Sequence, residues 1–431
     1  MSVALQSLIG VISLLAIAYA FSANRRAINW RIIGIGLVLH SGFCLLFSKV
    51  VVARHMLESF SAGFVHMLNF SGDGARFIFG DLANPGGKLA FIFAFNVLPI
   101  LMFFSGLSAL LYHFGILQRV VFGLAWLMKR TMRLSGPESL SVAANIFMGQ
   151  SEAPLLVKPY ISRMTRSELF CLMVGGMATL AGSVLAAYVS FLGGTDPVEQ
   201  AKFATWLLLA SLMNAPAAVI FAKIMMPEDD PEHMSSNRMD YDHGHQGHFI
   251  NALVAGTVEG LKLAAIVAAV LMVCVSLIAL INHLSQNWLG EMLGVNNWIR
   301  DSTGGAFSGL TLQYVFGQLC RPVAWLLGVP WNETLLVGSL LGQKVVVNEF
   351  IAYLDLGRMK EQGLLSAHSI LISTFALSSF SNFSSVGICV AGIGAMAPGK
   401  QQTMAEIGMR ALLAAVLAGL LTAAVGALWL S

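Results

Sequence analysis

The segment GPESLSVAANIFMGQSEAPLLVKPY, residues 136–160, decides the fold, because its tip is polar while the runs around it are apolar. The tip presents Gln150, Ser151 and Glu152 side by side, and Pro154 follows at once. Proline interrupts a helix, since it lacks an N–H donor and its ring clashes with the preceding turn. Polar side chains at an interrupted backbone therefore predict a polar pocket.

Composition places this pocket in a membrane protein. Of the 431 residues, 57% are hydrophobic and 11% are charged, whereas charged residues make up about a quarter of an ordinary soluble domain. A net charge of +3 is too small to indicate a nucleic-acid partner. The five cysteines lie far apart without a CxxC spacing, so neither a metal site nor a disulfide framework is predicted.

About eight transmembrane helices are predicted, because a span needs about 20 apolar residues. A serine-rich middle interrupts the run 364–397, and the other runs are continuous: 3–21, 32–52, 89–113, 168–192, 203–226, 252–282 and 404–430. No basic residue precedes the first run, and Asn24-Arg25-Arg26 follows it. This order predicts a retained first span rather than a cleaved signal peptide.

Residues 118–133 predict an amphipathic helix that lies in the membrane interface, because basic and apolar side chains fall on opposite faces at a spacing near 3.6. The arginines are Arg119, Arg130 and Arg133, and opposite them are Val121, Leu124 and Met128.

A hydrophilic linker, residues 227–248, holds three histidines within six residues: His243, His245 and His248. A metal site is one interpretation of this cluster. A solvated cytoplasmic loop is the favoured one, because the glycines and polar neighbours fix no ligand geometry.

Orientation follows from lysine and arginine, which are more frequent in cytoplasmic loops. If the first loop is cytoplasmic, and if 136–160 and 330–356 each enter and leave on one side, fifteen of the 25 lysines and arginines lie inside and nine outside, with Lys344 inside a hairpin. The bias predicts that both termini lie outside, which is the periplasm for the inner (plasma) membrane of a bacterium.

A second segment, PWNETLLVGSLLGQKVVVNEFIAYL from residue 330, matches the first in outline. Each segment has Gly-Gln in its middle and a carboxylate shortly after, Glu152 in one and Glu349 in the other. Each is followed by a span with a small, polar interruption, GGMATLAGS at 175–183 and SSFSNFSSVG at 378–387. We interpret 136–160 as a first re-entrant hairpin and 330–356 as a second, in an inverted repeat with the binding site where the copies meet.

The predicted pocket suits a neutral solute rich in hydroxyl groups. Carboxylates accept hydrogen bonds from hydroxyls, and amides both donate and accept. Lys344 is the one cation within either cluster, so the pocket suits phosphates poorly, and Phe380 and Phe383 could form an aromatic wall. The polar residues are Gln150, Ser151, Glu152, Glu349, Asn382, Ser384 and Ser385.

Two other classes of function remain as alternatives. An intramembrane enzyme could use Glu152 and Glu349 as an acid/base pair, but no histidine or metal-ligand motif lies near either, so no enzyme is predicted. A passive channel for small polar solutes is the other alternative. The two-hairpin repeat argues against a channel, because a closed pocket suits occlusion better than free flow.

The sequence resembles the concentrative nucleoside transporter family, in the form of a bacterial member with eight spans. The resemblance extends from NWR at 29–31 to the last span. The resemblance is highly specific for this family when three motifs are taken together: GQSEAP, NEF and SNFSS. The other matching motifs are MTRSELF, GGMATLAGSVLAAY and MNAPAA.

The resemblance implies a homotrimer in the lipid bilayer, in which each protomer transports independently. It further implies a scaffold of spans 1, 2, 3 and 6 and a transport domain that moves like an elevator. The implied division is 1–117 (scaffold, spans 1–3 and an interfacial helix), 118–135 (amphipathic helix), 136–226 (first repeat, spans 4–5), 227–329 (cytoplasmic loop, span 6 and a connecting segment) and 330–431 (second repeat, spans 7–8).

The resemblance also implies roles for individual residues. The nucleobase would face Gln150, Ser151 and Glu152, with Val184 beside it. The ribose would be held by Glu349, Asn382 and Ser385, and Phe380 would contact the nucleoside. The ligands of a coupling sodium ion would be Asn145, Met148, Thr179 and Leu180, the last three wholly or partly through main-chain carbonyls.

Two positions depart from the commonest family pattern while keeping a hydroxyl: Ser151 replaces threonine, and Thr179 replaces serine. They leave the preference between purines and pyrimidines open. The coupling ion is also open, since some bacterial relatives use protons, although the oxygen ligands at Asn145 and Thr179 favour Na⁺.

Overall fold

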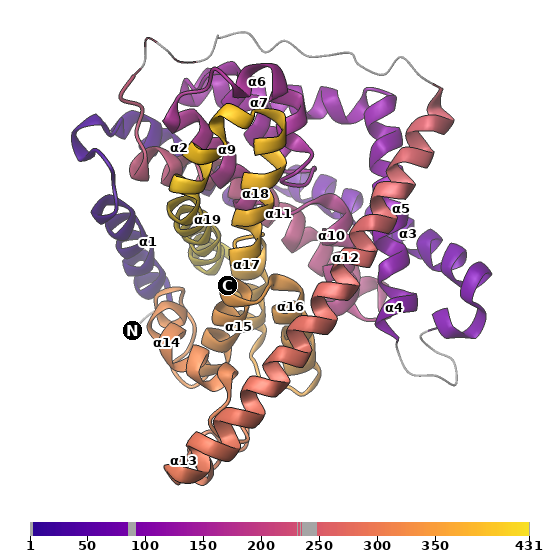
Figure 1. Ribbon diagram of the computed structural model, residues 1–431, viewed down its shortest axis with the longest axis vertical. Coiled ribbons are helices and arrows are strands. Elements are labelled where there is room, and N and C mark those ends of the chain that lie inside the picture. Colours follow the sequence, from indigo (N-terminus) through magenta and orange to yellow (C-terminus); the bar gives the residue numbers. More distant parts are fainter. Residues whose placement is uncertain (1–2, 85–91, 231, 233, 235–247, 431) are drawn as a thin grey trace.

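The computed structural model describes residues 3–84, 92–230, 232, 234 and 248–430, and the regular structure of these residues is helical throughout (Figure 1). The all-α polytopic class predicted from composition is therefore confirmed. Among the described residues, seven helices or helix pairs are long and apolar enough to cross a membrane, and they match the seven continuous runs. The eighth predicted span is divided between two shorter helices, Ala367–Leu377 and Phe383–Met396.

A long amphipathic helix separates the second span from the third along the chain. Spans one and two are α1 (Val3–Ala20) and α2 (Trp30–Lys49). The third begins with the single turn α4 (Phe93–Asn96) and continues as α5 (Leu98–His113). Between them α3 (Val51–Phe79) runs for 29 residues, burying a face at helical spacing that includes Leu57, Phe64 and Leu68. An interfacial helix was predicted within 1–117 without bounds, and α3 lies in that range.

The predicted amphipathic segment 118–133 is the helix α6 (Ile116–Met132). Val121 and Met128 are buried, whereas Arg119 and Arg130 are exposed, so the two predicted faces are confirmed. Arg133 ends the helix with a left-handed φ of 56°.

The first repeat contains the predicted hairpin and a broken span. The first arm of the hairpin, α7, ends at Ala144, and an irregular tip follows that holds Asn145 to Glu152. The fourth span breaks at Thr179, as GGMATLAGS predicted. The elements are α7 (Gly136–Ala144), η3 (Ala153–Val157), α8 (Lys158–Ile161), α9 (Arg166–Ala178), α10 (Gly182–Gly193) and α11 (Pro197–Met225).

The second repeat has the same order of parts. Its hairpin breaks at Val347 and Asn348, and its second arm reaches Glu361, five residues beyond the predicted end at 356. The following span breaks between Ser378 and Asn382. The elements are α15 (Thr334–Val346), α16 (Glu349–Glu361), α17 (Ala367–Leu377), α18 (Phe383–Met396) and α19 (Gln401–Leu430).

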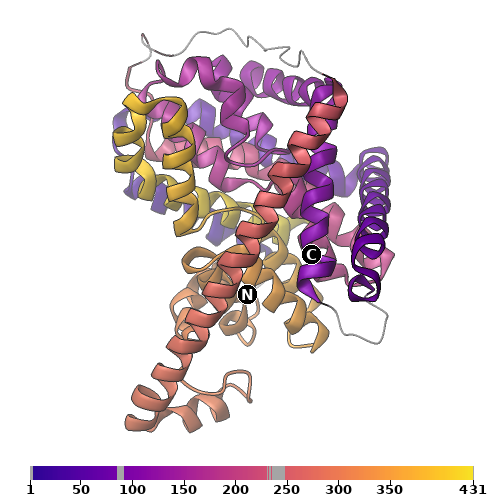
Figure 2. The same cartoon turned by 45° about the vertical axis from the view of Figure 1, so that its right-hand side comes forward.

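The helix α12 (Phe249–Leu284) crosses the molecule diagonally, and its far end projects beyond the neighbouring helices (Figures 1 and 2). It packs closely on α5 because glycine faces the contact. A Cβ on Gly256 would lie 2.5 Å from the Ala109 Cβ, and one on Gly260 would lie 2.7 Å from the Met102 Cα. The chain then continues through η5 (Ser285–Gly290), α13 (Val295–Ser302) and α14 (Leu312–Leu326).

The first two spans pack against helices of the second half of the chain. The α1 residue Gln6 donates to the Val329 carbonyl oxygen at 3.1 Å. In α2, buried His40 lies 3.1 Å from the Thr422 hydroxyl of α19. The helix α1 thus contacts the segment just before the second repeat, and α2 contacts α19 within it.

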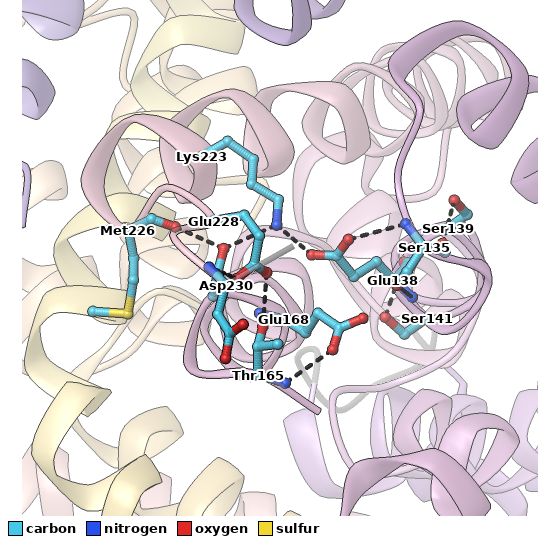
Figure 3. A network of polar contacts seen from close by, with 11 residues as sticks. Ser135, Glu138, Ser139, Ser141, Thr165, Glu168, Lys223, Met226, Glu228 and Asp230 are labelled. Atoms are coloured by element: carbon cyan, nitrogen blue, oxygen red, sulfur yellow. Dashed lines mark hydrogen bonds and ion pairs between the residues drawn. The ribbon is translucent and has the colours of Figure 1, made fainter. Parts of the chain in front are cut away.

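A buried ion pair connects the ends of three helices in the first repeat (Figure 3). The Lys223 ammonium of α11 lies 2.5 Å from the Glu138 carboxylate of α7 and 2.9 Å from the Ser167 hydroxyl of α9. Nearby, Thr165 donates to Glu228 at 2.7 Å, and burial raises the pKa of the Glu228 carboxyl against the opposing effect of that hydrogen bond. Buried charges persist when they are paired and hydrogen-bonded, so this network holds α7, α9 and α11 as one unit.

The predicted histidine cluster falls largely outside the described residues, because His243 and His245 belong to the segment 235–247. His248 is exposed and precedes α12. Within the described ranges no group of three His, Cys, Asp or Glu side chains is placed to hold a metal ion.

Candidate functional site

Four of the predicted site residues form one chain of hydrogen bonds where the two repeats meet. Gln150, in the tip of the first hairpin, donates to the Ser385 hydroxyl at 3.4 Å. The Ser385 N–H donates to the Asn382 side-chain oxygen at 2.9 Å. The Asn382 amide in turn donates to the Glu349 carboxylate of the second hairpin at 2.8 Å. All four residues are buried, so the structure brings together side chains up to 235 positions apart.

Local chain breaks create these positions. Asn382 caps α18 and Asn348 caps α16, each through its side-chain oxygen. Glu349 is the first residue of α16, where the partial positive charge of the helix N-terminus stabilises a carboxylate. The interruptions predicted from serine, asparagine and glycine therefore supply both the polar groups and their orientation.

Tyr188 is a site residue that the sequence analysis missed. Its hydroxyl donates to the Glu349 carboxylate at 3.2 Å, and its ring stacks on Tyr353 with centroids 4.2 Å apart. A signal for it was present, because Tyr188 follows Val184 by four residues and so shares its helix face.

Cys389 is a second missed residue. Its buried thiol donates to the Gln150 side-chain oxygen at 3.4 Å, so both ends of the Gln150 amide contact α18. Its position four residues after Ser385 places it on the same face of that helix.

Ser384, another predicted residue, attaches to this chain by donating to the Asn382 side-chain oxygen at 2.7 Å, whereas Phe383 is exposed. The other predicted residues of the pocket take no part in the chain. Ser151 and Glu152 are exposed, and the Glu152 carboxylate accepts from the Gly149 N–H at 3.3 Å. Val184 is buried near the start of α10, and Phe380 is half-buried in the break before α18. They flank the site as apolar or solvent-facing groups.

The geometry suits a ligand that donates hydroxyl groups. An ionised carboxylate offers about four lone-pair positions, and Glu349 uses one on each oxygen, for Tyr188 and for Asn382. Positions that remain on the carboxylate can accept from a ligand. No salt bridge within the described ranges involves Glu349.

The residues predicted to hold a cation fit that purpose. Asn145 is fully buried at the end of α7, and its side-chain oxygen has no hydrogen-bond partner. A Cβ built on Gly176 in the last turn of α9 lies 3.8 Å from that oxygen. Thr179, where α9 ends, donates its hydroxyl proton to the Gly175 carbonyl at 2.9 Å, which leaves the hydroxyl oxygen free to accept. The carbonyls of Met148 and Leu180 would complete the predicted set, whose oxygen donors are of the kind that hard cations take.

A cavity of about 1170 Å³ lies away from this site. Residues of α3, α4, α5 and α12 line one side and residues of α10 and α16 the other, including Phe93, Phe191 and Arg358. It separates the third and sixth spans from parts of both repeats, so we do not assign it to the ligand.

Family comparisons cover most of the chain. Residues 206–427 match the family described as "Na+ dependent nucleoside transporter C-terminus", and residues 9–82 match the corresponding N-terminus. Residues 94–195 match the family described as "Nucleoside recognition".

Individual relatives agree with these families. An uncharacterized transporter of Haemophilus influenzae is 39% identical, with 99% of this chain and 98% of that protein covered. The putative nucleoside permease NupX of Escherichia coli is 35% identical over 98% and 97% of the two chains. Sodium/nucleoside cotransporter 1 of Rattus norvegicus is 34% identical over 98% of this chain and 63% of that longer protein.

Solved structures of the protein CNTnw show the same fold. CNTnw in an inward-facing substrate-bound state is 36% identical, covers both chains completely and superposes with a TM-score of 0.88. A CNTnw variant in an outward-facing state has a TM-score of 0.87 over 100% of this chain and 98% of that one.

The fold and the site define a multi-pass membrane transporter, not an enzyme, with its polar site between two hairpin-containing repeats. The chain belongs to the concentrative nucleoside transporter family, as the sequence motifs predicted.

Proposed function

We propose that the protein is a sodium-coupled symporter that takes up nucleosides across the bacterial inner membrane, with both termini in the periplasm. The observation that carries this proposal is the buried chain from Gln150 through Ser385 and Asn382 to Glu349. It joins an amide that can hydrogen-bond to a base edge to a carboxylate that can accept from hydroxyl groups, which matches the chemistry of a nucleoside.

In this proposal the two hairpins contact different parts of the ligand. Gln150 binds the nucleobase, with Ser151 and Glu152 at the solvent-facing end and Val184 beside the ring. The ribose hydroxyls bind Glu349, with Asn382 and Ser385 holding the carboxylate and the backbone of the break in position. Phe380 covers the sugar from the same break.

The coupling ion binds in the first repeat at Asn145, Met148, Thr179 and Leu180. The buried, unpartnered oxygen of Asn145 supports this assignment, because such an oxygen is costly unless a cation or donor satisfies it. An ion at this position would tie the end of α7 to the end of α9 and so fix the tip that carries Gln150. The nucleoside must then raise the affinity for sodium by the factor by which sodium raises the affinity for the nucleoside.

We infer that transport occurs by an elevator movement of the two repeats past the third and sixth spans. The inward-facing and outward-facing states of CNTnw support alternating access in the fold. The cavity between α12 and the α10–α16 surface supports a boundary at that place. We propose a homotrimeric assembly in the bilayer, a scaffold that includes α5 and α12, and a transport domain formed by 136–226 and 330–431.

Coupling to protons is the second candidate, and a passive channel is the third. The oxygen donor set at Asn145 favours sodium over a proton, because none of its four residues carries an ionisable side chain in the physiological range. The enclosed Gln150–Glu349 chain favours occlusion over free flow.

Uptake of radiolabelled uridine and adenosine into proteoliposomes tests the three candidates. An inward sodium gradient should drive accumulation above the external concentration. Accumulation that follows a proton gradient in choline medium would select proton coupling. Nucleoside that equilibrates across the membrane without accumulating under either gradient would indicate a channel.

A further inference from the structure

Lys344 is a buried lysine that none of the proposed roles uses. It lies near the end of α15 in the second hairpin, and 2% of its surface is exposed. Its ammonium donates to the Ala376 carbonyl oxygen and to the Ser379 hydroxyl, each at 2.6 Å. It takes part in no salt bridge among the described residues, although the Glu349 carboxylate lies within electrostatic range.

The surroundings of the ammonium are those of a cation site. Ala376 belongs to the last turn of α17, where unpaired carbonyls give the helix end a partial negative charge. Ser379 lies in the break that follows and also contacts the Ser381 hydroxyl at 3.0 Å. Gly419 of α19 leaves room for the group, since a Cβ there would lie 3.4 Å from the Lys344 nitrogen and 2.9 Å from the Ser379 oxygen.

The first repeat has the same arrangement without the ammonium. There the hairpin arm ends at Asn145, beside Gly175 and Gly176 in the last turn of α9, and Thr179 supplies a hydroxyl in the break. Both sites combine the end of a hairpin arm, the carbonyl end of a broken span and a hydroxyl. In the first repeat an oxygen is left without a partner, whereas in the second the Lys344 side chain supplies a positive charge.

We propose that the Lys344 ammonium is a tethered cation that fills, in the second repeat, the position equivalent to the ion site of the first. This inference rests on the proposed ion site at Asn145. The second hairpin is then held against the break before α18 at all times, which fixes Glu349 and Asn382. The first hairpin is held only when an ion binds, so the diffusible ion controls the Gln150 side of the pocket.

Replacing Lys344 with alanine tests the proposal, because it removes the charge and leaves a space the size of propylammonium. Uridine binding to purified protein would be measured against sodium at constant ionic strength, with choline as the replacement, and with or without propylammonium. We expect K344A to lose about tenfold or more in uridine affinity. Propylammonium, or sodium well above the wild-type requirement, should restore most of it.

Two further variants make the result specific. K344M keeps the apolar stem and fills the space, so it should lose affinity as K344A does but show no recovery with propylammonium. Lys400, which donates to the Met164 carbonyl at 2.9 Å and takes no part in the hydrogen-bond chain or the proposed ion site, is the matched control. K400A should keep the wild-type affinity and the wild-type sodium dependence.

Two outcomes would overturn the proposal. One is a K344A protein with wild-type uridine affinity and wild-type sodium dependence. The other is a K344A protein that loses affinity and recovers it with neither cation, since Lys344 would then have a structural role only. If wild-type uridine binding is itself independent of sodium, the proposed coupling ion is wrong, and recovery of K344A by propylammonium still tests the tethered cation separately.

Discussion

Replacing Glu349 with glutamine should abolish most nucleoside binding while leaving the protein folded. The carboxylate accepts from Asn382 at 2.8 Å and from Tyr188 at 3.2 Å, one bond on each oxygen. In the proposed complex it also accepts from both ribose hydroxyls. A glutamine at this position offers a single accepting oxygen, and its NH₂ group would face another donor.

The magnitude follows from the two bonds to ribose. A hydrogen bond to a charged group contributes about 1.5–3 kcal/mol, so two such bonds contribute about 3–6 kcal/mol. Since about 1.4 kcal/mol corresponds to a tenfold change in Kd, E349Q should bind uridine between about a hundredfold and about ten-thousandfold more weakly. A loss of affinity near a hundredfold is expected, because the Glu349 carboxylate of the unliganded protein already accepts hydrogen bonds from its two protein donors.

The assay is equilibrium binding of uridine and 2′,3′-dideoxyuridine to the wild type and to E349Q. The wild type should bind the dideoxynucleoside poorly, and the two ligands should become nearly equal in E349Q, because mutation and ligand remove the same bonds. E361Q is the matched control, as Glu361 is exposed at the far end of the same helix. If E349Q weakens both ligands by the same factor, Glu349 does not hold the ribose.

Three further predictions test other parts of the account. Removing the Lys223 ammonium leaves its carboxylate partner buried and unpaired, so K223M should lower the free energy of unfolding by about 3–5 kcal/mol. K262M removes the lysine of an exposed pair, so it should change the free energy of unfolding by less than about 1 kcal/mol. Both variants would be compared by thermal unfolding in detergent, and an equal loss in the two would refute the role of burial. Replacing Asn145 with leucine removes the unpartnered oxygen, so uridine affinity should become equal in sodium and choline buffers; a retained sodium effect would place the ion elsewhere. The rings of Phe93 and Phe191 lie 5.8 Å apart, so cysteines at these two positions can be joined by a short bismaleimide. The cross-link should stop uptake yet permit nucleoside binding from the open side. Uptake at the full rate after cross-linking would exclude the elevator movement.

The sequence was sufficient to predict the helices and helix breaks that have strong hydropathy or breaker signals. The seven continuous spans, both hairpins and both broken spans follow from apolar length and from glycine, serine and proline at the interruptions. The polar residues Gln150, Asn382 and Glu349 were predictable as a set, because burying each of them inside an apolar chain is costly without partners.

Other features depend on tertiary packing that hydropathy does not contain. The helix α3 is amphipathic over 29 residues, so its apolar residues never form a continuous run. Tyr188 and Cys389 lie on helix faces that resemble plain core until the partner helix is known. One of the two partners of Lys344 is a main-chain carbonyl 32 residues away, and no side-chain pattern indicates it.

A structure of the protein with uridine bound in sodium tests the central claim most directly. The account predicts ribose hydroxyls within about 2.7–3.2 Å of the Glu349 carboxylate and the base edge at the same distance from the Gln150 amide. Uridine located in the cavity beside Phe93 and Arg358, or with its ribose away from Glu349, would contradict the account.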